Sequence, residues 1–251
     1  LSDQTWLWTS VISGVFLAVT GGLLLWDLEH PERFYLIFTR PQWRSWLVRG
    51  AFIIAGYSLV LALHFVGSLM GSTSLQGWLM IPGIPLSILT AIYTAYLFAQ
   101  AKARDMWQNP LLPPHLLVQA LLLGSAVLLL FRVITQTGQP ASHYAIPVEI
   151  PLLWILAVSS SLHLLMTWGE VSLTHSTAHA RLAIWEMVNG RYKADFRIGI
   201  VLSVLGALLP LLSLYEFVSP SLGIGGAPMA LIGLMLYENA YVQAGQSVPL
   251  A

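Results

Sequence analysis

The sequence predicts an all-α fold, a polytopic bundle of transmembrane helices with seven spans in this chain. Of its 251 residues, 57% are hydrophobic and only 9% are charged, whereas about a quarter of a soluble domain is charged. Apolar runs recur along the whole chain, and a membrane-spanning helix needs roughly 20 such residues to cross a hydrocarbon core about 30 Å thick. The basic residues gather in alternate connections between these runs.

Seven stretches are long and apolar enough to span a bilayer. They cover residues 6–26, 46–70, 76–100, 115–136, 147–168, 196–217 and 222–241. Together they predict a single transmembrane domain over residues 1–251. A shorter stretch at 176–188 is expected to form an amphipathic helix on the membrane surface.

Small residues and prolines inside the apolar runs allow further predictions. Small residues at 21–22, 124–126 and 159–161 predict close contacts between helices, because small side chains let helix backbones approach each other. Prolines inside three runs remove backbone donors and favour interrupted helices. These prolines are Pro82, Pro85, Pro210 and Pro228.

Three connections are long and polar, at residues 27–45, 101–114 and 169–195. Ten of the eleven lysines and arginines lie in them or at the adjoining helix ends. The positive-inside rule makes that face cytoplasmic, so the C-terminus is expected inside. The chain begins at Leu1 with no charged segment before a short apolar run, so we expect no signal peptide and allow for a lost N-terminal piece.

Ionisable groups at membrane depth are costly, so each is a functional candidate. On the outer half we expect a pocket for a polar head group, with the candidates His64, Arg132, Glu149, Tyr215 and Glu216. On the inner half we expect a proton path, with the candidates His163, Glu238, Tyr93 and Tyr96. Two alternatives stay open: Arg132 forms a structural ion pair with Glu149 or Glu216, and each histidine is a hydrogen-bonded core residue.

Several classes of protein are disfavoured. The charge is balanced at 11 basic and 11 acidic residues, which argues against a nucleic-acid surface, and the chain has no cysteine to ligate an iron-sulfur cluster. His64 and His163 are expected at levels about 16 Å apart, too far for one haem iron. His115 is expected at the inner interface. The last run has no lysine for a retinal Schiff base.

The first long connection carries the most specific motif. It reads D-L-E-H-P-E-R-F at 27–34 and R-P-Q-W-R-S-W at 40–46. Residues 103–113, and Glu238 with residues 244–250, form two weaker motifs. Together they make the chain resemble the NrfD/PsrC family, the membrane subunits of polysulfide-reductase-like complexes and of alternative complex III. Within the first motif, the resemblance singles out Asp27, Pro31, Glu32 and Arg33.

The resemblance implies a subunit of a respiratory oxidoreductase in the bacterial inner membrane. Such a subunit exchanges electrons between a membrane quinone, menaquinone or ubiquinone, and a partner iron-sulfur subunit, with possible coupled proton transfer. A molybdopterin or multihaem subunit on the outer side is also implied. The chain itself would hold no haem, no iron-sulfur cluster and no metal, and would not be catalytic alone.

The family usually places the D-L-x-x-P-E-R-F motif after its second span, whereas here it follows the first. We therefore expect the full protein to have eight or more spans. Two other functions stay open from the sequence. The first is a transporter or proton-conducting protein without redox chemistry, since the prolines of this chain resemble those of broken transporter helices. The second is a passive anchor for soluble subunits.

Overall fold

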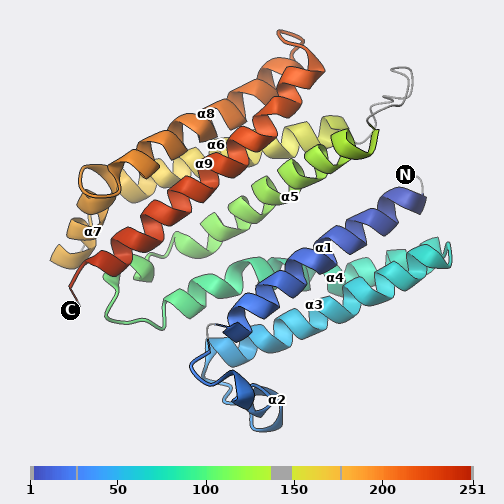
Figure 1. Ribbon diagram of the computed structural model, residues 1–251, viewed down its shortest axis with the longest axis horizontal. Helices are drawn as coiled ribbons and strands as arrows, with labels where there is room; N and C mark the ends of the chain where they lie inside the picture. The colour runs from blue at the N-terminus through green and yellow to red at the C-terminus, as the bar shows by residue number, and fades with distance from the viewer. Residues whose placement is uncertain (1–2, 27, 137–148, 176, 250–251) are drawn as a thin grey trace. The chain divides into compact units, whose positions relative to one another are not determined.

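A computed structural model describes residues 3–26, 28–136, 149–175 and 177–249 of the chain. Within these residues the structure consists of helices and contains no strand (Figure 1). In chain order they are α1 (Asp3–Trp26), η1 (Pro31–Arg33), α2 (Leu36–Thr39), α3 (Trp46–Leu69), α4 (Thr73–Phe98), η2 (Asp105–Gln108), α5 (Leu112–Gln136), α6 (Glu149–Ser172), α7 (Ala178–Val188), α8 (Lys193–Leu214) and α9 (Pro220–Ser247).

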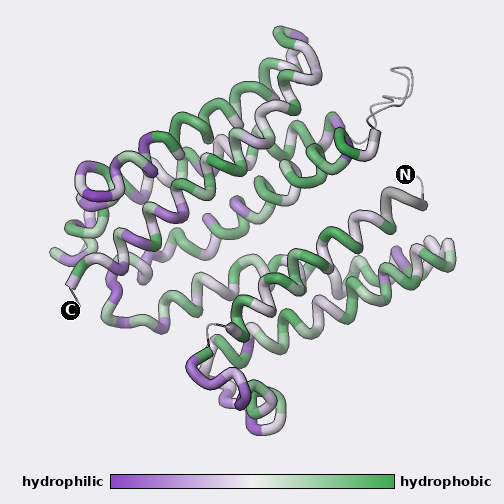
Figure 2. The backbone as a smooth tube through the Cα atoms, in the orientation of Figure 1, coloured by the Kyte–Doolittle hydropathy of each residue, from purple (hydrophilic) through white to green (hydrophobic). Residues whose placement is uncertain are grey.

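Seven of the described helices are long and apolar enough to cross a membrane, namely α1, α3, α4, α5, α6, α8 and α9. Their large apolar side chains are widely exposed, for example Trp26 at 87% and Ile134 at 72%. A surface of this kind suits lipid, because the bilayer interior is itself apolar. Figure 2 shows hydrophobic residues along the long helices and hydrophilic ones gathered around α2 and α7. The predicted all-α, seven-span membrane protein is confirmed.

The chain divides into two compact units, Leu1–Gln100 and Ala101–Ala251. In the first unit, α3 packs against both α1 and α4, while η1 and the short α2 lie in the connection between α1 and α3 (Figure 1). Close packing of α3 on α4 occurs at Gly50. A Cβ atom at this position would lie 2.5 Å from two ring carbons of Tyr93, so the tyrosine ring occupies the space that a side chain would need.

The second unit is a bundle of α5, α6, α8 and α9, with α7 against the ends of α8 and α9. Its most extensive contact joins α8 and α9, where small residues face each other. A Cβ atom on Gly206 would lie 2.7 Å from the Cβ of Ala230, and one on Gly233 would lie 2.7 Å from the amide nitrogen of Ser203. Close approach of this kind is how small residues drive helix association in lipid.

Of the small residues expected to mark close packing, Ser125, Ala126, Ser159 and Ser160 are buried, at 3% exposure or less, whereas three glycines are not closely packed. A Cβ atom added at Gly21, Gly22 or Gly124 would meet no atom of a neighbouring element within 4 Å. The prediction was therefore wrong at these glycines. A single small residue on a helix does not reveal whether a partner helix lies opposite, whereas the repeated spacing in α8 and α9 makes matching grooves.

Several helices extend beyond the ranges read from hydropathy. Helix α5 begins at Leu112, α6 continues to Ser172 and α9 continues to Ser247. Helices α4, α8 and α9 run without interruption through their prolines. Helix α7 forms within the stretch expected to be amphipathic, and the hydroxyl of Thr177 caps its start by accepting from the amide of Ala180 at 3.1 Å. Its position at a membrane surface stays a prediction.

Candidate functional site

Four polar side chains meet inside the second unit, well away from any exposed surface. They are His115 from α5, His163 and Glu170 from α6, and Tyr237 from α9, and we call them the buried cluster. Each is at most 1% exposed. Ionisable side chains at membrane depth are expensive and mark functional sites by default, so the buried cluster is the leading candidate site.

Glu170 is the centre of the buried cluster. Its Oε1 atom lies 3.1 Å from Nδ1 of His115 and accepts a hydrogen bond from the side-chain amide of Asn109 at 3.3 Å. Its Oε2 atom accepts a hydrogen bond from the hydroxyl of Tyr237. Both carboxylate oxygens are therefore partnered, which is what a buried charge requires if it is to be tolerated.

The two histidines continue the chain of contacts beyond the carboxylate. Nε2 of His115 lies 2.8 Å from Nδ1 of His163. The ring of Tyr237 packs edge-on against His163, with ring centroids 4.9 Å apart, and tilted against His115 at 5.6 Å. Tyr237 therefore holds both imidazoles in place as well as donating to Glu170.

The order of contacts fixes how protons can be arranged. If Glu170 is ionised, Nδ1 of His115 carries a proton and donates it to the carboxylate. A neutral His115 then accepts from His163 at Nε2, whereas a protonated His115 donates to His163. When a proton binds at Nε2 of His163 and the Nδ1 proton of His163 passes to Nε2 of His115, the Nε2 atom of His163 changes from acceptor to donor. The cluster can therefore relay a proton without moving a side chain.

The relay ends at Nε2 of His163, which could form a further hydrogen bond. Nε2 of His163 is buried and has no hydrogen-bond partner among the described residues, and the same holds for the hydroxyls of Ser160 and Thr167. These two residues lie about one turn to either side of His163 on α6. Unsatisfied buried polar groups are rare in proteins and each calls for an explanation. Here the three groups lie on one face of α6, with Ser160 and Thr167 on either side of His163.

Local sequence explains why these side chains meet. The side chain of Asn109 accepts from the amide of Leu111 at 3.0 Å and so shapes the turn before α5. Pro113 and Pro114 then occupy the first turn of α5, where prolines cost no hydrogen bond. His115 follows in that same turn. His163 and Glu170 are seven residues apart on α6, which is two helical turns, and therefore share one face.

A second polar contact lies beside the buried cluster. The side-chain amide of Gln119 on α5 donates to Glu238 on α9 at 2.5 Å. The hydroxyl of Tyr241 donates to the carbonyl of Met106 at 3.3 Å, and its ring stacks on Tyr237. The predicted proton-path residues His163 and Glu238 therefore lie in neighbouring contacts, although Glu238 is only partly buried.

The other two predicted proton-path residues belong to the first unit. Tyr93 is 3% exposed and packs against Gly50, while Tyr96 stacks on the indole of Trp46 with ring centroids 4.3 Å apart. These contacts are those of core and helix-packing residues. A role for Tyr93 or Tyr96 in proton transfer stays a prediction.

His64 lies on α3 in the first unit and joins a polar ladder across three helices. Its Nδ1 atom lies 2.8 Å from the hydroxyl of Ser10 on α1. Its backbone carbonyl accepts from Ser68, whose hydroxyl in turn accepts from Gln76 on α4. A mostly apolar cavity of about 420 Å³ lies between α1 and α3, and Ser10 and Ser58 line it.

Arg132 and Glu149 form an ion pair at the opposite end of the second unit from the buried cluster. Nε of Arg132 lies 3.5 Å from Oε1 of Glu149, and both side chains are mostly buried. Tyr215, just after α8, contacts Trp154 edge-on and is 63% exposed. Glu216 has a positive φ of 62° and makes no ion pair with a described residue.

The family motif forms the start of the connection between α1 and α3. Pro31, Glu32 and Arg33 make the short helix η1, and Glu32 pairs with His30 at 3.1 Å. Asp27 lies outside the described residues. The motif therefore shapes a compact turn at the end of a span.

No group of three or more His, Asp or Glu side chains in the described part of the chain is arranged to hold a metal ion. The contact between His115 and His163 is a direct one between ring nitrogens. It therefore leaves no space for an iron atom between the rings.

Of the four members of the buried cluster, only His163 was selected as a candidate from the sequence. Glu170 was expected in a loop because the apolar run ended at Trp168, and His115 was expected at an interface. The sequence does contain signals for His115 and Glu170, but each signal lies within a single helix. The spacing of seven from His163 to Glu170 favours one helical face, and the paired prolines before His115 favour a helix start.

Comparison with known proteins agrees with this picture. A family model described as polysulphide reductase, NrfD, matches residues 3–249. Protein NrfD of Escherichia coli K12 is 26% identical over 277 aligned residues, covering 98% of this chain and 84% of that protein. A membrane subunit of a putative dimethyl sulfoxide reductase from Halobacterium salinarum is 24% identical, over 79% of this chain and 50% of that protein. No solved structure gave a significant match. The chain therefore belongs to the polysulphide reductase NrfD family.

Proposed function

We propose that this chain is the quinone-interacting membrane subunit of a respiratory oxidoreductase complex. It exchanges electrons between membrane quinone and a partner iron-sulfur subunit, and it transfers protons as it does so. It has no activity alone. Its family and the name of the Halobacterium relative, a membrane subunit of a putative dimethyl sulfoxide reductase, support this class of assembly.

The observation that carries the proposal is the buried cluster. A bound quinone supplies two-electron chemistry in which its ring oxygens gain or lose two protons. A subunit that serves it therefore needs groups that hold and move protons within the membrane. His163, His115 and Glu170 form a continuous relay of such groups, with contacts of 2.8 and 3.1 Å. A passive anchor has no need of a buried carboxylate and two imidazoles, which cost stability.

The cavity lined by Ser10 and Ser58 is the site that we propose for the quinone ring, and His64 reaches it through its 2.8 Å contact with the hydroxyl of Ser10. Hydroxyl and imidazole groups can donate to a quinone oxygen and carry its proton. The rest of the lining is largely apolar, including Leu17, Leu61 and Phe65, and suits a planar ring and the start of an apolar tail. The residues present therefore fit a quinone. Arg132, Glu149, Tyr215 and Glu216 stay candidates for the same role in the second unit.

We further propose the bacterial inner membrane as the location, with the C-terminus in the cytoplasm. The basic residues between α1 and α3 and around α7 support this orientation through the positive-inside rule. The partner iron-sulfur subunit, together with a molybdopterin or multihaem subunit, would then dock on the outer side. Either menaquinone or ubiquinone would suit the cavity.

The test uses the complete complex purified with its partners. His64→Ala should abolish quinone-coupled turnover, and Glu170→Gln should slow it at least about tenfold because general acid-base groups contribute at least that much. Both variants should keep the activity of the partner enzyme with an artificial acceptor. Ser87→Ala, which removes a half-buried hydroxyl on α4 that donates to the carbonyl of Ile84 on the same helix, is the control. Unchanged quinone kinetics in both variants would refute the proposal.

Proton conduction without redox chemistry is the second candidate function, because the buried cluster would serve it equally. Proteoliposomes containing the complex separate the two functions. Proton uptake that requires quinol turnover supports the redox subunit, whereas uptake driven by a pH gradient alone supports a conductor. A transporter with broken helices is less favoured, since the helices of the described chain run unbroken through their prolines.

A further inference from the structure

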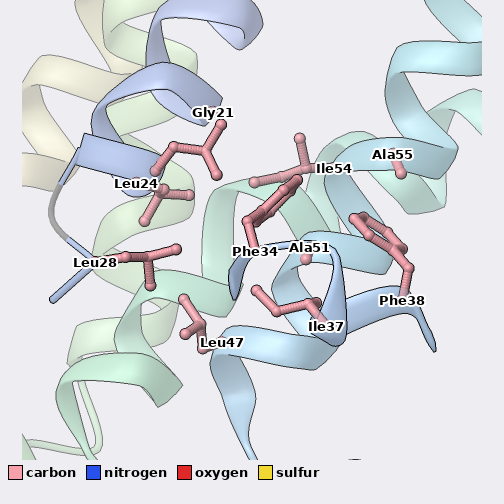
Figure 3. Close-up of a pocket in the computed structure, with 11 residues that line it drawn as sticks. Gly21, Leu24, Leu28, Phe34, Ile37, Phe38, Leu47, Ala51, Ile54 and Ala55 are labelled. Carbon is pink, nitrogen blue, oxygen red and sulfur yellow. The ribbon is translucent and has the colours of Figure 1, made fainter. Parts of the chain in front are cut away.

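The first unit contains an apolar pocket where α1 ends and the connection to α3 folds back on it. The pocket has a volume of about 160 Å³ and is partly open to its surroundings. Figure 3 shows Leu24 and Leu28 of the α1 side facing Phe34, Ile37 and Ile54 across this space. This volume is smaller than the roughly 300–1,000 Å³ of sites that enclose a whole ligand, so the pocket has room for part of an apolar chain. Every lining side chain is hydrocarbon, so its occupant must present an apolar chain.

Arginines stand next to the lining residues in the sequence. Arg33 and Arg40 flank the lining segment from Phe34 to Phe38, and Arg44 lies three residues before Leu47. All three arginines are exposed, and none forms an ion pair with a residue that the structure describes. No acidic residue occurs between Arg33 and Arg49. Asp27, Glu29 and Glu32 precede Arg33 in the same connection, so residues 27–49 carry a small excess of positive charge, four arginines against three acids.

Exposed aromatic residues place this region at the level of lipid head groups. Trp26 at the end of α1 is 87% exposed, and Tyr35 and Trp43 in the connection are 62% and 55% exposed. Tryptophan and tyrosine collect at the boundary between hydrocarbon and head groups because their rings are apolar and their tips polar. An apolar pocket at that depth, with arginines beside it, matches an amphiphile with an anionic head.

We propose that this pocket binds one acyl chain of an anionic phospholipid, whose phosphate is held by Arg33, Arg40 and Arg44. The bilayer is as apolar as the pocket, so apolar transfer alone favours neither place for the chain. Selection must therefore come from the head group. Basic pockets beside transmembrane helices bind anionic head groups in this way. The site is separate from the buried cluster and does not depend on quinone exchange.

Two adjacent glycines allow the pocket to be tested by filling it. Gly21 lines the pocket and Gly22 does not, yet an added Cβ atom would meet no neighbouring element within 4 Å at either position. Gly21→Leu and Gly22→Leu both replace glycine with a better helix former, so both should fold. The complete complex is delipidated in detergent, and phosphatidylglycerol and phosphatidylcholine with identical chains are titrated by native mass spectrometry.

We expect preferential retention of phosphatidylglycerol, reduced about tenfold by Gly21→Leu and unchanged by Gly22→Leu. A triple variant, Arg33→Gln, Arg40→Gln and Arg44→Gln, should reduce retention about a hundredfold because each arginine contributes. The matched triple Arg181→Gln, Arg191→Gln and Lys193→Gln removes the same charge elsewhere and should have no effect. Equal binding of both lipids, equal effects of the two glycine variants, or release of a quinone by Gly21→Leu would each overturn the proposal.

Discussion

His115 and Glu170 lie 3.1 Å apart with both side chains 1% exposed, joining the first turn of α5 to the last turn of α6. A buried pair of this kind gains little net stability, because desolvation offsets most of the attraction. Removing only one partner is much worse, since the other is left buried without compensation. Each residue therefore depends on the other, in addition to its contacts with Asn109, Tyr237 or His163.

This dependence predicts the outcome of a double-mutant cycle. Glu170→Leu and His115→Leu alone should each destabilise the chain by about 3–5 kcal/mol. The double variant should cost clearly less than the sum of the two, because neither member of the pair is left buried without the other, although Asn109, Tyr237 and His163 each lose a partner. Unfolding of the detergent-solubilised protein, followed by circular dichroism, measures the three free energies. Additive losses would show that the residues act independently.

The hydrogen bonds of Tyr237 and Tyr241 on α9 predict that removing the two hydroxyls has different effects on stability. Tyr237 donates to the carboxylate of Glu170, whereas Tyr241 donates to the backbone carbonyl of Met106 at 3.3 Å. Tyr237→Phe should cost about 1–2 kcal/mol, at the upper end for a membrane hydrogen bond because its acceptor is a buried carboxylate. Tyr241→Phe should cost less than half of that.

Both substitutions keep the ring and its packing, so they report on the hydroxyl alone. The same unfolding measurement compares them with the unchanged protein. A larger loss for Tyr241→Phe than for Tyr237→Phe would contradict the assignment of Glu170 as the centre of the cluster.

Hydropathy predicts most of the fold because the lipid requirement is simple. Each span needs length and apolar surface, and both can be read from composition along the chain. The ends of helices are harder to read, because a buried Glu170 looks in the sequence like the first residue of a polar loop. Its burial depends on Asn109, His115 and Tyr237, which arrive from other helices. No local pattern contains that information.

The candidate site residues, like the fold, could be predicted only in part from the sequence. His163 and Glu238 were predicted from depth alone, and the structure places each in a polar contact within the second unit. The partners of these residues, His115 and Gln119, follow from how α5 packs against α6 and α9. Pairing between helices depends on tertiary packing, which periodicity within one helix does not encode.

The close contact between α8 and α9 predicts that one methyl group added at Gly233 lowers the stability of the second unit. A Cβ atom on Gly233 would lie 2.7 Å from the amide nitrogen of Ser203, so the helices must separate to admit it. Gly233→Ala should therefore destabilise the second unit by about 1–3 kcal/mol, the usual cost of overpacking. Gly225→Ala on the same helix meets no neighbouring element within 4 Å and should be neutral or slightly stabilising. Equal melting temperatures for the two variants would argue against the close approach.

The ion pair of Arg132 and Glu149 allows a structural role to be separated from quinone binding. Each single change, Arg132→Glu or Glu149→Arg, replaces the ion pair with two like charges at the same two positions and should lower stability. The exchanged pair, with both substitutions together, restores attraction and should recover most of that stability. If the two residues only hold α5 to α6, quinone-coupled turnover of the complex should recover as well.

If the pair contacts a quinone, exchanging the charges reverses the field at its oxygens, and turnover should stay low although the protein is stable again. Measuring thermal unfolding and quinone kinetics on the same four proteins distinguishes these outcomes. Recovery of both properties would remove Arg132 and Glu149 from the quinone candidates and leave His64 as the principal one. Recovery of stability alone would place the quinone ring near the end of α5, in the second unit.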